Sequence, residues 1–248
     1  MTGRRICILG GCGGIGRGLV SACQANDDAV AVLDLKMSLA RHPTPGGVIT
    51  VEIDGSDEGS VTNAFAKVTE RWGALDGFVN AAGFLVALQP LTQTPVHEFD
   101  TTIEGNVRTA FLCCKAAMTL LEKGEAPSLV NLASGLGGFI RPNYGPYAAS
   151  KAAIIALTKT LALEHAPRVR ANAIAPGAVD TAFLRGGTGR SEERNSSTID
   201  IATYSAAIPL RRIADVDDIV GPIMFLLGPL NTYMTGQTLW VNGGAYMP

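Results

Sequence analysis

The sequence predicts a single α/β domain over residues 1–248, in which a doubly wound parallel sheet of about seven strands is flanked by helices on both faces. Short apolar runs alternate with longer amphipathic segments, as βαβ units require. The runs lack polar alternation, as in strands that are buried on both sides. With 47% hydrophobic and 17% charged residues, the chain can bury one large core.

Four strands and the helices between them are predicted in the first half of the chain. The strands are expected at residues 5–9, 29–33, 48–53 and 75–80. Helices are expected at residues 14–24 and 57–72, the second with a core-facing stripe that includes Val61, Phe65 and Val68. Pro43 and Pro45 leave room for at most a turn or two of helix between residues 37 and 47.

The second half continues the same alternation. One long helix is expected at residues 96–121, and its core-facing residues are Ile103, Val107, Phe111 and Leu112 or their neighbours. Further helices are expected at residues 146–165 and 217–227, and strands at residues 129–133, 169–174 and 237–241.

Residues 181–207 interrupt this rhythm. The segment carries three glycines near its start and then a polar run, with little apolar content before Ile199. A polar, glycine-rich insertion of this length in a compact domain is usually a lid or a disordered loop. We interpret it as a lid over a substrate site, with a disordered loop as the alternative.

Composition excludes several classes of function. A net charge of −2 gives no broad cationic field for nucleic acid or an anionic membrane. Five cysteines without a Cys-x-x-Cys pair favour neither a disulfide framework nor a metal site. No apolar run approaches the length of a signal sequence core or a membrane span. We therefore expect a cytoplasmic protein with no metal.

A glycine-rich turn follows the first predicted strand and opens the first helix. It reads Gly10-Gly11-Cys12-Gly13-Gly14-Ile15-Gly16, so its glycines follow a Gly-x-x-x-Gly-x-Gly spacing. Glycines let the backbone approach a pyrophosphate at a helix amino terminus. In this context the turn indicates a dinucleotide site, with a merely flexible turn as the alternative.

Asp34 stands at the end of the second predicted strand, 18 residues after Gly16. A carboxylate there can accept hydrogen bonds from both hydroxyls of an adenine ribose and repels a 2′-phosphate. Lys36 is the only cation nearby in sequence. The pattern favours NAD over NADP, the alternative being a solvated aspartate at a strand end.

Tyr147 and Lys151 are four residues apart in a predicted helix, so their side chains share one face. A cation beside a phenol favours the phenolate, which would make Tyr147 an acid or base nearer neutral pH. By itself the spacing is weak evidence for a functional pair, because Tyr-x-x-x-Lys is usually part of a solvated helix face.

Several separated motifs together resemble the short-chain dehydrogenase/reductase family, whose members have a Rossmann fold. Residues Gly10, Gly14 and Gly16 resemble its cofactor loop, and Asn80-Ala81-Ala82-Gly83 resembles its Asn-Asn-Ala-Gly segment. Ser134, Tyr147 and Lys151 match the spacing of its catalytic residues, with Asn106 at the position of the fourth. Pro176-Gly177-Ala178-Val179-Asp180-Thr181 is similar to its Pro-Gly-x-Val-x-Thr segment, and Asp54 corresponds to its acidic residue near adenine.

The resemblance implies a role for each matched residue. Ser134 would hydrogen-bond the substrate oxygen, Tyr147 would exchange the proton, and Lys151 would lower the pKa of Tyr147 and hold the nicotinamide ribose. Asn106 would keep a water near Lys151 for proton relay. The residues implied to bind the cofactor are Gly10, Cys12, Gly14, Ile15, Gly16, Asp34, Asp54, Asn80, Ala81, Gly83, Tyr147, Lys151, Pro176, Gly177, Val179 and Thr181.

Substrate selection is expected from the lid and from residues that flank the motifs, namely Phe84, Leu85, Leu136, Arg141, Tyr144 and Phe183. Arg141 could hold a carboxylate or phosphate, although a solvent-facing arginine is the simpler interpretation. The few fixed charges near the motifs favour a neutral, partly apolar secondary alcohol.

The sequence thus predicts an NAD-dependent oxidoreductase that acts on a secondary alcohol or its ketone. One alternative is an NADPH-dependent 3-oxoacyl-[acyl-carrier-protein] reductase, against which Asp34 argues. Another is a nucleotide-sensing regulatory protein, because fold does not fix function. The resemblance also implies a homotetramer or homodimer.

Overall fold

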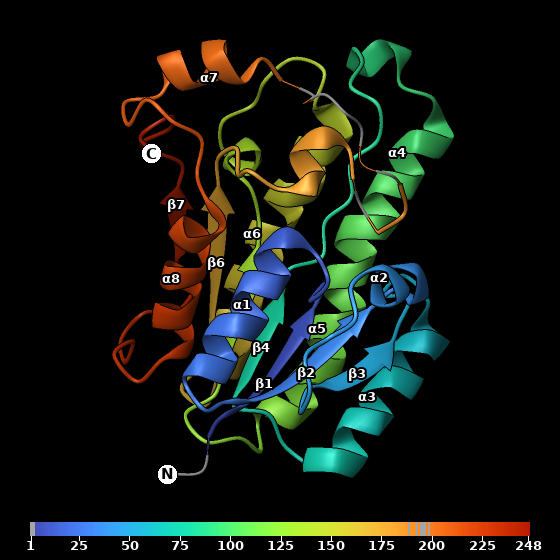
Figure 1. Ribbon diagram of the computed structural model, residues 1–248, viewed down its shortest axis with the longest axis vertical. Helices are drawn as coiled ribbons and strands as arrows, with labels where there is room; N and C mark the ends of the chain where they lie inside the picture. The colour runs from blue at the N-terminus through green and yellow to red at the C-terminus, as the bar shows by residue number, and fades with distance from the viewer. Residues whose placement is uncertain (1–2, 188, 192, 194–196, 198) are drawn as a thin grey trace.

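The computed structural model describes residues 3–187, 189–191, 193, 197 and 199–248. Its centre is a parallel seven-stranded sheet with the strand order β3-β2-β1-β4-β5-β6-β7, which confirms the predicted fold class (Figure 1). The strands are β1 (Arg5–Leu9), β2 (Ala29–Asp34), β3 (Ile49–Glu52), β4 (Gly77–Asn80), β5 (Ser128–Leu132), β6 (Arg170–Pro176) and β7 (Thr238–Val241).

Helices cover both faces of the sheet. Helices α1 and α8 pack on each other and on one face, whereas α3, α5 and α6 cover the other (Figure 1). The helices are α1 (Gly14–Ala25), α2 (Lys36–Arg41), α3 (Glu58–Trp72), α4 (Val96–Ile103), α5 (Thr109–Leu121), α6 (Gly145–His165), α7 (Ile201–Ala207) and α8 (Val216–Leu227). Short 3₁₀ turns span Leu91–Gln93, Gly135–Gly137 and Ala182–Arg185, and a π-helical turn spans Glu104–Arg108.

The two helical layers explain why the strands are hydrophobic without alternation. Successive side chains of β1 enter different cores: Ile6 and Ile8 pack with the α1/α8 side, and Cys7 and Leu9 with the α3/α5 side. All four are at most 3% exposed. A polar residue at any of them would be buried without a water partner.

The order of the strands reverses beside β1, which pairs with both β2 and β4. Leu9 is in register with Leu33 on one side and with Asn80 on the other. The turns that follow these three strands therefore leave the same edge of the sheet next to one another. In doubly wound folds, the crevice at such a switch point is where ligands bind.

The long helix predicted at residues 96–121 is not a uniform α-helix. A π-helical turn at Glu104–Arg108 separates α4 from α5. Because a π turn holds one residue more than an α turn, it rotates the downstream face. Phe111, which we expected in the core, is 51% exposed, whereas Leu112 is 6% exposed. The prediction that Phe111 faces the core was wrong, because it assumed that the α-helical period continues through the π turn.

The expected lid contains more regular structure than its polar sequence indicates. Its described part includes the 3₁₀ turn Ala182–Arg185 and helix α7, which lies beyond the carboxyl ends of the strands (Figure 1). Residues 188, 192, 194–196 and 198 of the expected lid lie outside the described residues. Within the described ranges, no helix combines the length and apolarity needed to cross a membrane.

Candidate active site

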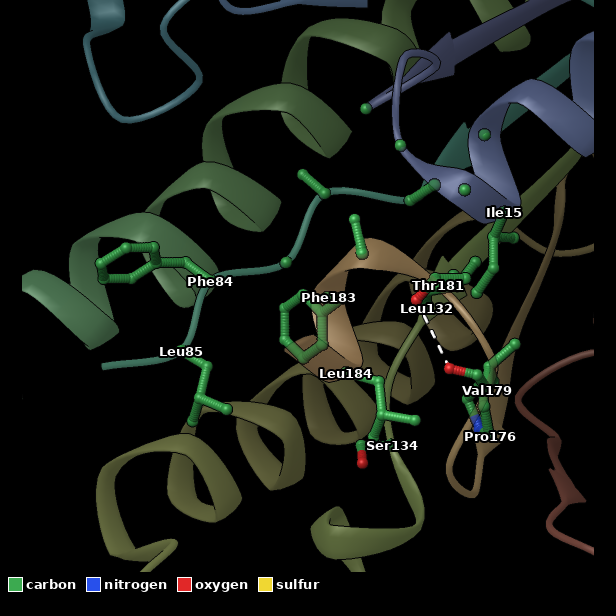
Figure 2. Close-up of a pocket in the computed structure, with 18 of the residues that line it drawn as sticks. Ile15, Phe84, Leu85, Leu132, Ser134, Pro176, Val179, Thr181, Phe183 and Leu184 are labelled. Carbon is green, nitrogen blue, oxygen red and sulfur yellow. Dashed lines mark hydrogen bonds between the residues drawn. The ribbon is translucent and has the colours of Figure 1, made fainter. Parts of the chain in front are cut away.

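A cavity of about 680 Å³ opens at the carboxyl ends of the central strands. Its walls come from the glycine turn after β1, the loops after β2, β4, β5 and β6, the start of α6 and the expected lid. Figure 2 shows Phe183 and Leu184 reaching into this cavity above Ser134, with Leu85 on a separate segment. The sequence motifs that are far apart in the chain therefore meet in one place.

The glycine turn has a shape that only glycine allows at two positions. Gly10 has a φ of +79°, and a Cβ there would lie 2.9 Å from the backbone carbon of Ala81. A Cβ on Gly16 would lie 2.2 Å from the carbonyl oxygen of Gly10. Helix α1 begins at Gly14 without a side-chain cap or an acidic first turn. Its free N–H groups and positive end suit the pyrophosphate of a dinucleotide.

Replacing Gly16 by alanine is expected to destabilise the turn, because the new methyl group would collide with the carbonyl of Gly10. The expected loss is about 2–4 kcal/mol of unfolding free energy, measured by denaturation without ligand. Gly13→Ala is the matched control, since its Cβ meets only one atom, at 3.4 Å. Equal stability of the two variants would show that the turn is looser than described.

Asp34 lines the cavity at the end of β2 and is 8% exposed. One carboxylate oxygen accepts the backbone N–H of Cys12 at 2.9 Å, and the other accepts that of Leu35 at 2.8 Å. Asp34 thus also ties the glycine turn to β2. Lys36 is absent from the described wall of the cavity, whereas Arg17, Arg41 and Arg190 are part of it. Reasoning from sequence neighbours missed these three cations.

Asp54 lies just outside the cavity, between the lining residues Ile53 and Gly55. Its carboxylate accepts hydrogen bonds from Ser56 and forms an ion pair of 2.9 Å with Arg190 of the expected lid. Although burial raises the pKa of Asp54, these partners hold it below its usual value. The pair connects the lid to the loop after β3.

Asn80 supports the turn beneath the glycines rather than facing the cavity. It is 1% exposed, donates to Asn131 at 3.1 Å and accepts the N–H of Ala82 at 3.2 Å. Ala81 and Gly83, which follow it, do line the cavity. Asn80 therefore fixes the backbone that packs against Gly10.

Cys12 behaves as a packing residue of the glycine turn. Its side chain is 3% exposed, and burial raises the pKa of its thiol to about 12. A thiol with that pKa is almost entirely protonated at neutral pH and hence a poor nucleophile. Ile15, the next side chain of the turn, faces the cavity (Figure 2).

Tyr147 lies in the first turn of α6 and is 9% exposed at the cavity wall. Burial raises the pKa of its phenol to about 12, whereas a hydrogen bond with Ser134 acts in the opposite direction. Ser134 follows β5 and also accepts the N–H of Leu136 at 3.2 Å. The hydroxyls of Ser134 and Tyr147 are thus neighbours, as the motif spacing predicted.

Lys151 lies one turn further along α6, with its ammonium nitrogen 5.6 Å from the centre of the Tyr147 ring. It is 2% exposed and donates to the carbonyl of Leu132 at 2.9 Å. Burial lowers the pKa of Lys151 to about 8. The tyrosine pKa is raised here and not lowered as expected, because burial of the phenol outweighs its hydrogen bond.

Asn106 lies in the π-helical turn and is 1% exposed. Its amide accepts the N–H of Phe84 and donates to the carbonyl of Phe84, each at 2.8 Å. Its second N–H donates to Ser150 at 2.9 Å, and Ser150 donates to the carbonyl of Tyr147 at 2.7 Å. Both amide donors are used within the protein, so Asn106 positions the start of α6 and the loop after β4.

The wall opposite α6 comes from the segment after β6. Pro176, Gly177, Val179 and Thr181 all line the cavity, and the Thr181 hydroxyl lies 3.5 Å from the carbonyl of Val179 (Figure 2). The Thr181 methyl packs on the glycine turn, since a Cβ on Gly14 would lie 2.6 Å from it. This segment therefore closes the cavity against the amino terminus of α1.

The predicted substrate residues also line the cavity, but their side chains point in different directions. Phe183 lies over Tyr147, with 6.1 Å between ring centres. The Phe84 ring turns toward Gly105, where a Cβ would meet it at 3.2 Å. The other predicted residues that line the wall are Leu85, Leu136, Arg141 and Tyr144. Sequence reasoning missed Phe139, Tyr204 and Tyr246, which no motif marks.

Comparison with known proteins finds relatives that match nearly the whole chain. A family model described as enoyl-(acyl carrier protein) reductase matches residues 10–246. The short-chain type dehydrogenase/reductase y4vI of Sinorhizobium fredii is 33% identical over 254 residues, which cover 98% of this chain and 43% of that protein. The 2-(R)-hydroxypropyl-CoM dehydrogenase of Xanthobacter autotrophicus is 32% identical over 249 residues, 96% of each protein. The solved structure of ElxO with NADP bound superposes with a TM-score of 0.88 at 27% identity, covering 98% of each chain.

The fold and site therefore define a nicotinamide-dependent class of oxidoreductase. The chain belongs to the short-chain dehydrogenase/reductase family, as its motifs indicated.

Proposed function

We propose that this chain is an NAD(H)-dependent oxidoreductase that interconverts a secondary alcohol and its ketone. The observation that carries the proposal is the meeting of Ser134, Tyr147 and Lys151 with the glycine turn in one cavity. The Xanthobacter relative is named as a dehydrogenase of a hydroxypropyl compound, which is also a secondary alcohol. NAD, when bound, supplies the hydride acceptor.

The roles of the three side chains follow from their contacts. Ser134 would donate a hydrogen bond to the substrate oxygen and stabilise negative charge there. Tyr147 would give its phenolic proton to that oxygen during reduction and take it back during oxidation. Lys151, which is held by the carbonyl of Leu132, would bind the nicotinamide ribose. Asn106, through Ser150, would hold the first turn of α6, which carries Tyr147.

Cofactor choice depends on Asp34 in this proposal. Asp34→Asn removes the negative charge that repels a 2′-phosphate, so the preference for NADH over NADPH should fall about tenfold or more, measured as the ratio of kcat/KM values. Lys36→Gln is the control, because Lys36 is not part of the described cavity wall. An unchanged ratio in Asp34→Asn would remove Asp34 from cofactor selection.

An NADPH-dependent 3-oxoacyl-[acyl-carrier-protein] reductase is the second candidate. The NADP bound to ElxO and the acyl-carrier description of the matching family model favour it. Arg17, Arg41 and Arg190 add positive charge to the cavity wall, which suits a 2′-phosphate. A nucleotide-sensing role on this fold is a third candidate, and the assembled Ser134 and Tyr147 pair argues against it.

A panel of secondary alcohols, ketones and 3-oxoacyl thioesters, followed by nicotinamide absorbance with each cofactor, separates these candidates. We expect turnover of an alcohol or ketone, with NADH preferred. A tenfold preference for NADPH would reject the cofactor assignment, and a thioester preference would favour the reductase. Cofactor binding without any turnover would favour the sensing role.

Three broader expectations complete the proposal. Residues 181–207 act as a substrate lid, which the Arg190–Asp54 ion pair holds against the loop after β3. Helices α5 and α6 pair with a second copy in a homotetramer or homodimer, since Phe111 and Leu163 are apolar and exposed on them. The cysteines are unpaired and buried, as suits a reducing cytoplasm.

A further inference from the structure

Arg141 lines the cavity in the loop between β5 and α6, where two aromatic rings contact its guanidinium. Its guanidinium carbon lies 5.1 Å from the ring centre of Tyr204 on α7 and 5.7 Å from that of Phe139. The Tyr204 hydroxyl in turn accepts the N–H of Ala178 at 3.3 Å, in the segment after β6. The charge is thus held by two aromatic rings on separate parts of the wall.

The guanidinium of Arg141 has no carboxylate partner among the described residues. Elsewhere in the described chain, Arg4 pairs with Asp28, and Arg5 pairs with Asp76 at 2.7 Å. Arg141 makes only cation–π contacts within the same part of the structure. Aromatic faces leave the N–H edge of a guanidinium unused, so its donors can bind a ligand.

The negative charges on the described cavity wall do not neutralise Arg141. Asp34 lies at the cofactor end and accepts two backbone N–H groups. Glu193 pairs with Arg185. Burial raises the pKa of Tyr144, and the positive charge of Arg141 acts in the opposite direction. The charge of Arg141 therefore acts on the cavity wall, at Tyr144.

We propose that Arg141 binds an anionic group of the substrate, so that the substrate is a hydroxy or oxo compound with a carboxylate, sulfonate or phosphate. The proposal rests on the oxidoreductase function above and replaces the neutral alcohol expected from the sequence. A planar guanidinium forms paired hydrogen bonds with such anions. The stack on Tyr204 and Phe139 orients it before the substrate binds, which lowers the entropic cost of recognition.

Matched acid and ester substrates test this proposal. The probes are 3-oxobutanoate, 4-oxopentanoate and 5-oxohexanoate, each compared with its methyl ester in the nicotinamide absorbance assay. For at least one chain length, we expect kcat/KM for the acid to exceed that for the ester about tenfold or more. Arg141→Met should lower kcat/KM about 100-fold for the acid and less than threefold for the ester. Arg141→Lys should recover part of the kcat/KM for the acid.

Arg71→Met is the control, because Arg71 is exposed in the last turn of α3, and it should behave as the unchanged protein. Equal losses for acid and ester in Arg141→Met would show that Arg141 only clamps α7, and would overturn the proposal. A higher kcat/KM for the esters than for the acids in the unchanged protein would also overturn it. Turnover of 2-butanone without reduction of any of the oxo acids or their esters would overturn it as well. Binding of NADH without reduction of any carbonyl compound would instead reject the oxidoreductase function on which the proposal rests.

Discussion

The Tyr147→Phe variant is expected to lose at least about 10³-fold in kcat while it binds NADH with nearly unchanged affinity. The phenol is the group that exchanges a proton with the substrate oxygen, and general acid–base catalysis contributes about 10²–10⁴-fold. Phenylalanine keeps the ring that packs beside Phe183 and loses only the hydroxyl near Ser134. Steady-state turnover and a fluorescence titration of NADH measure the two quantities separately.

The control for this variant is Tyr233→Phe, because Tyr233 is 99% exposed. It should keep full turnover, unfolding free energy and NADH affinity. Turnover by Tyr147→Phe within tenfold of the unchanged protein would mean that another group supplies the proton. Loss of NADH binding in Tyr147→Phe would mean that the phenol has a larger part in holding the cofactor.

The Lys151→Met variant should lose activity and gain stability at pH 7. Lys151 is charged yet 2% exposed, and folding lowers its pKa from 10.5 to about 8. Keeping it charged in the interior costs on the order of 3 kcal/mol. Methionine has a similar length without the charge, but it loses the bond to the carbonyl of Leu132. We expect a net gain of about 1–2 kcal/mol, seen as a Tm that is several degrees higher.

The pH dependence identifies the cause of that gain. A lysine whose pKa is lowered by folding destabilises the folded state by the full amount at every pH below that lowered pKa, because the buried side chain is then charged. Between pH 8 and 10.5 the folded protein has released the proton and the unfolded chain has not. The Tm difference between Lys151→Met and the unchanged protein should therefore shrink across this range. A difference independent of pH would indicate a packing effect instead.

The strands and the motifs could be predicted because each depends on local pattern. β1 fills two cores with Ile6, Cys7, Ile8 and Leu9, so its hydrophobicity is visible in the sequence. Helix α7 was missed because its seven residues span only two turns, bury no side chain and follow a polar run, so they show no core-facing stripe. The exposure of Phe111 was missed because the π turn at Asn106 breaks the helical period, and tertiary contacts with Phe84 accompany that turn.

The electrostatics of the site could not be predicted from motif spacing alone. Spacing placed Lys151 beside Tyr147, but the pKa of each group depends on burial. Burial raises the pKa of Tyr147 and lowers the pKa of Lys151. The stack of Arg141 on Tyr204 joins residues that are distant in the chain, so no local pattern could reveal it. Asn106 was recognised from its position, whereas its contacts with Phe84 and Ser150 required the fold.

The most direct test of the proposed function is the transfer of an isotope from cofactor to substrate. NADH that carries deuterium at the reacting carbon of the nicotinamide is incubated with the protein and a ketone from the panel, and the product is analysed by mass spectrometry and NMR. The proposal predicts a secondary alcohol with one deuterium on the carbinol carbon, formed by the unchanged protein and absent with Tyr147→Phe. A protein that binds NADH and yields no deuterated alcohol from any ketone of the panel would contradict it.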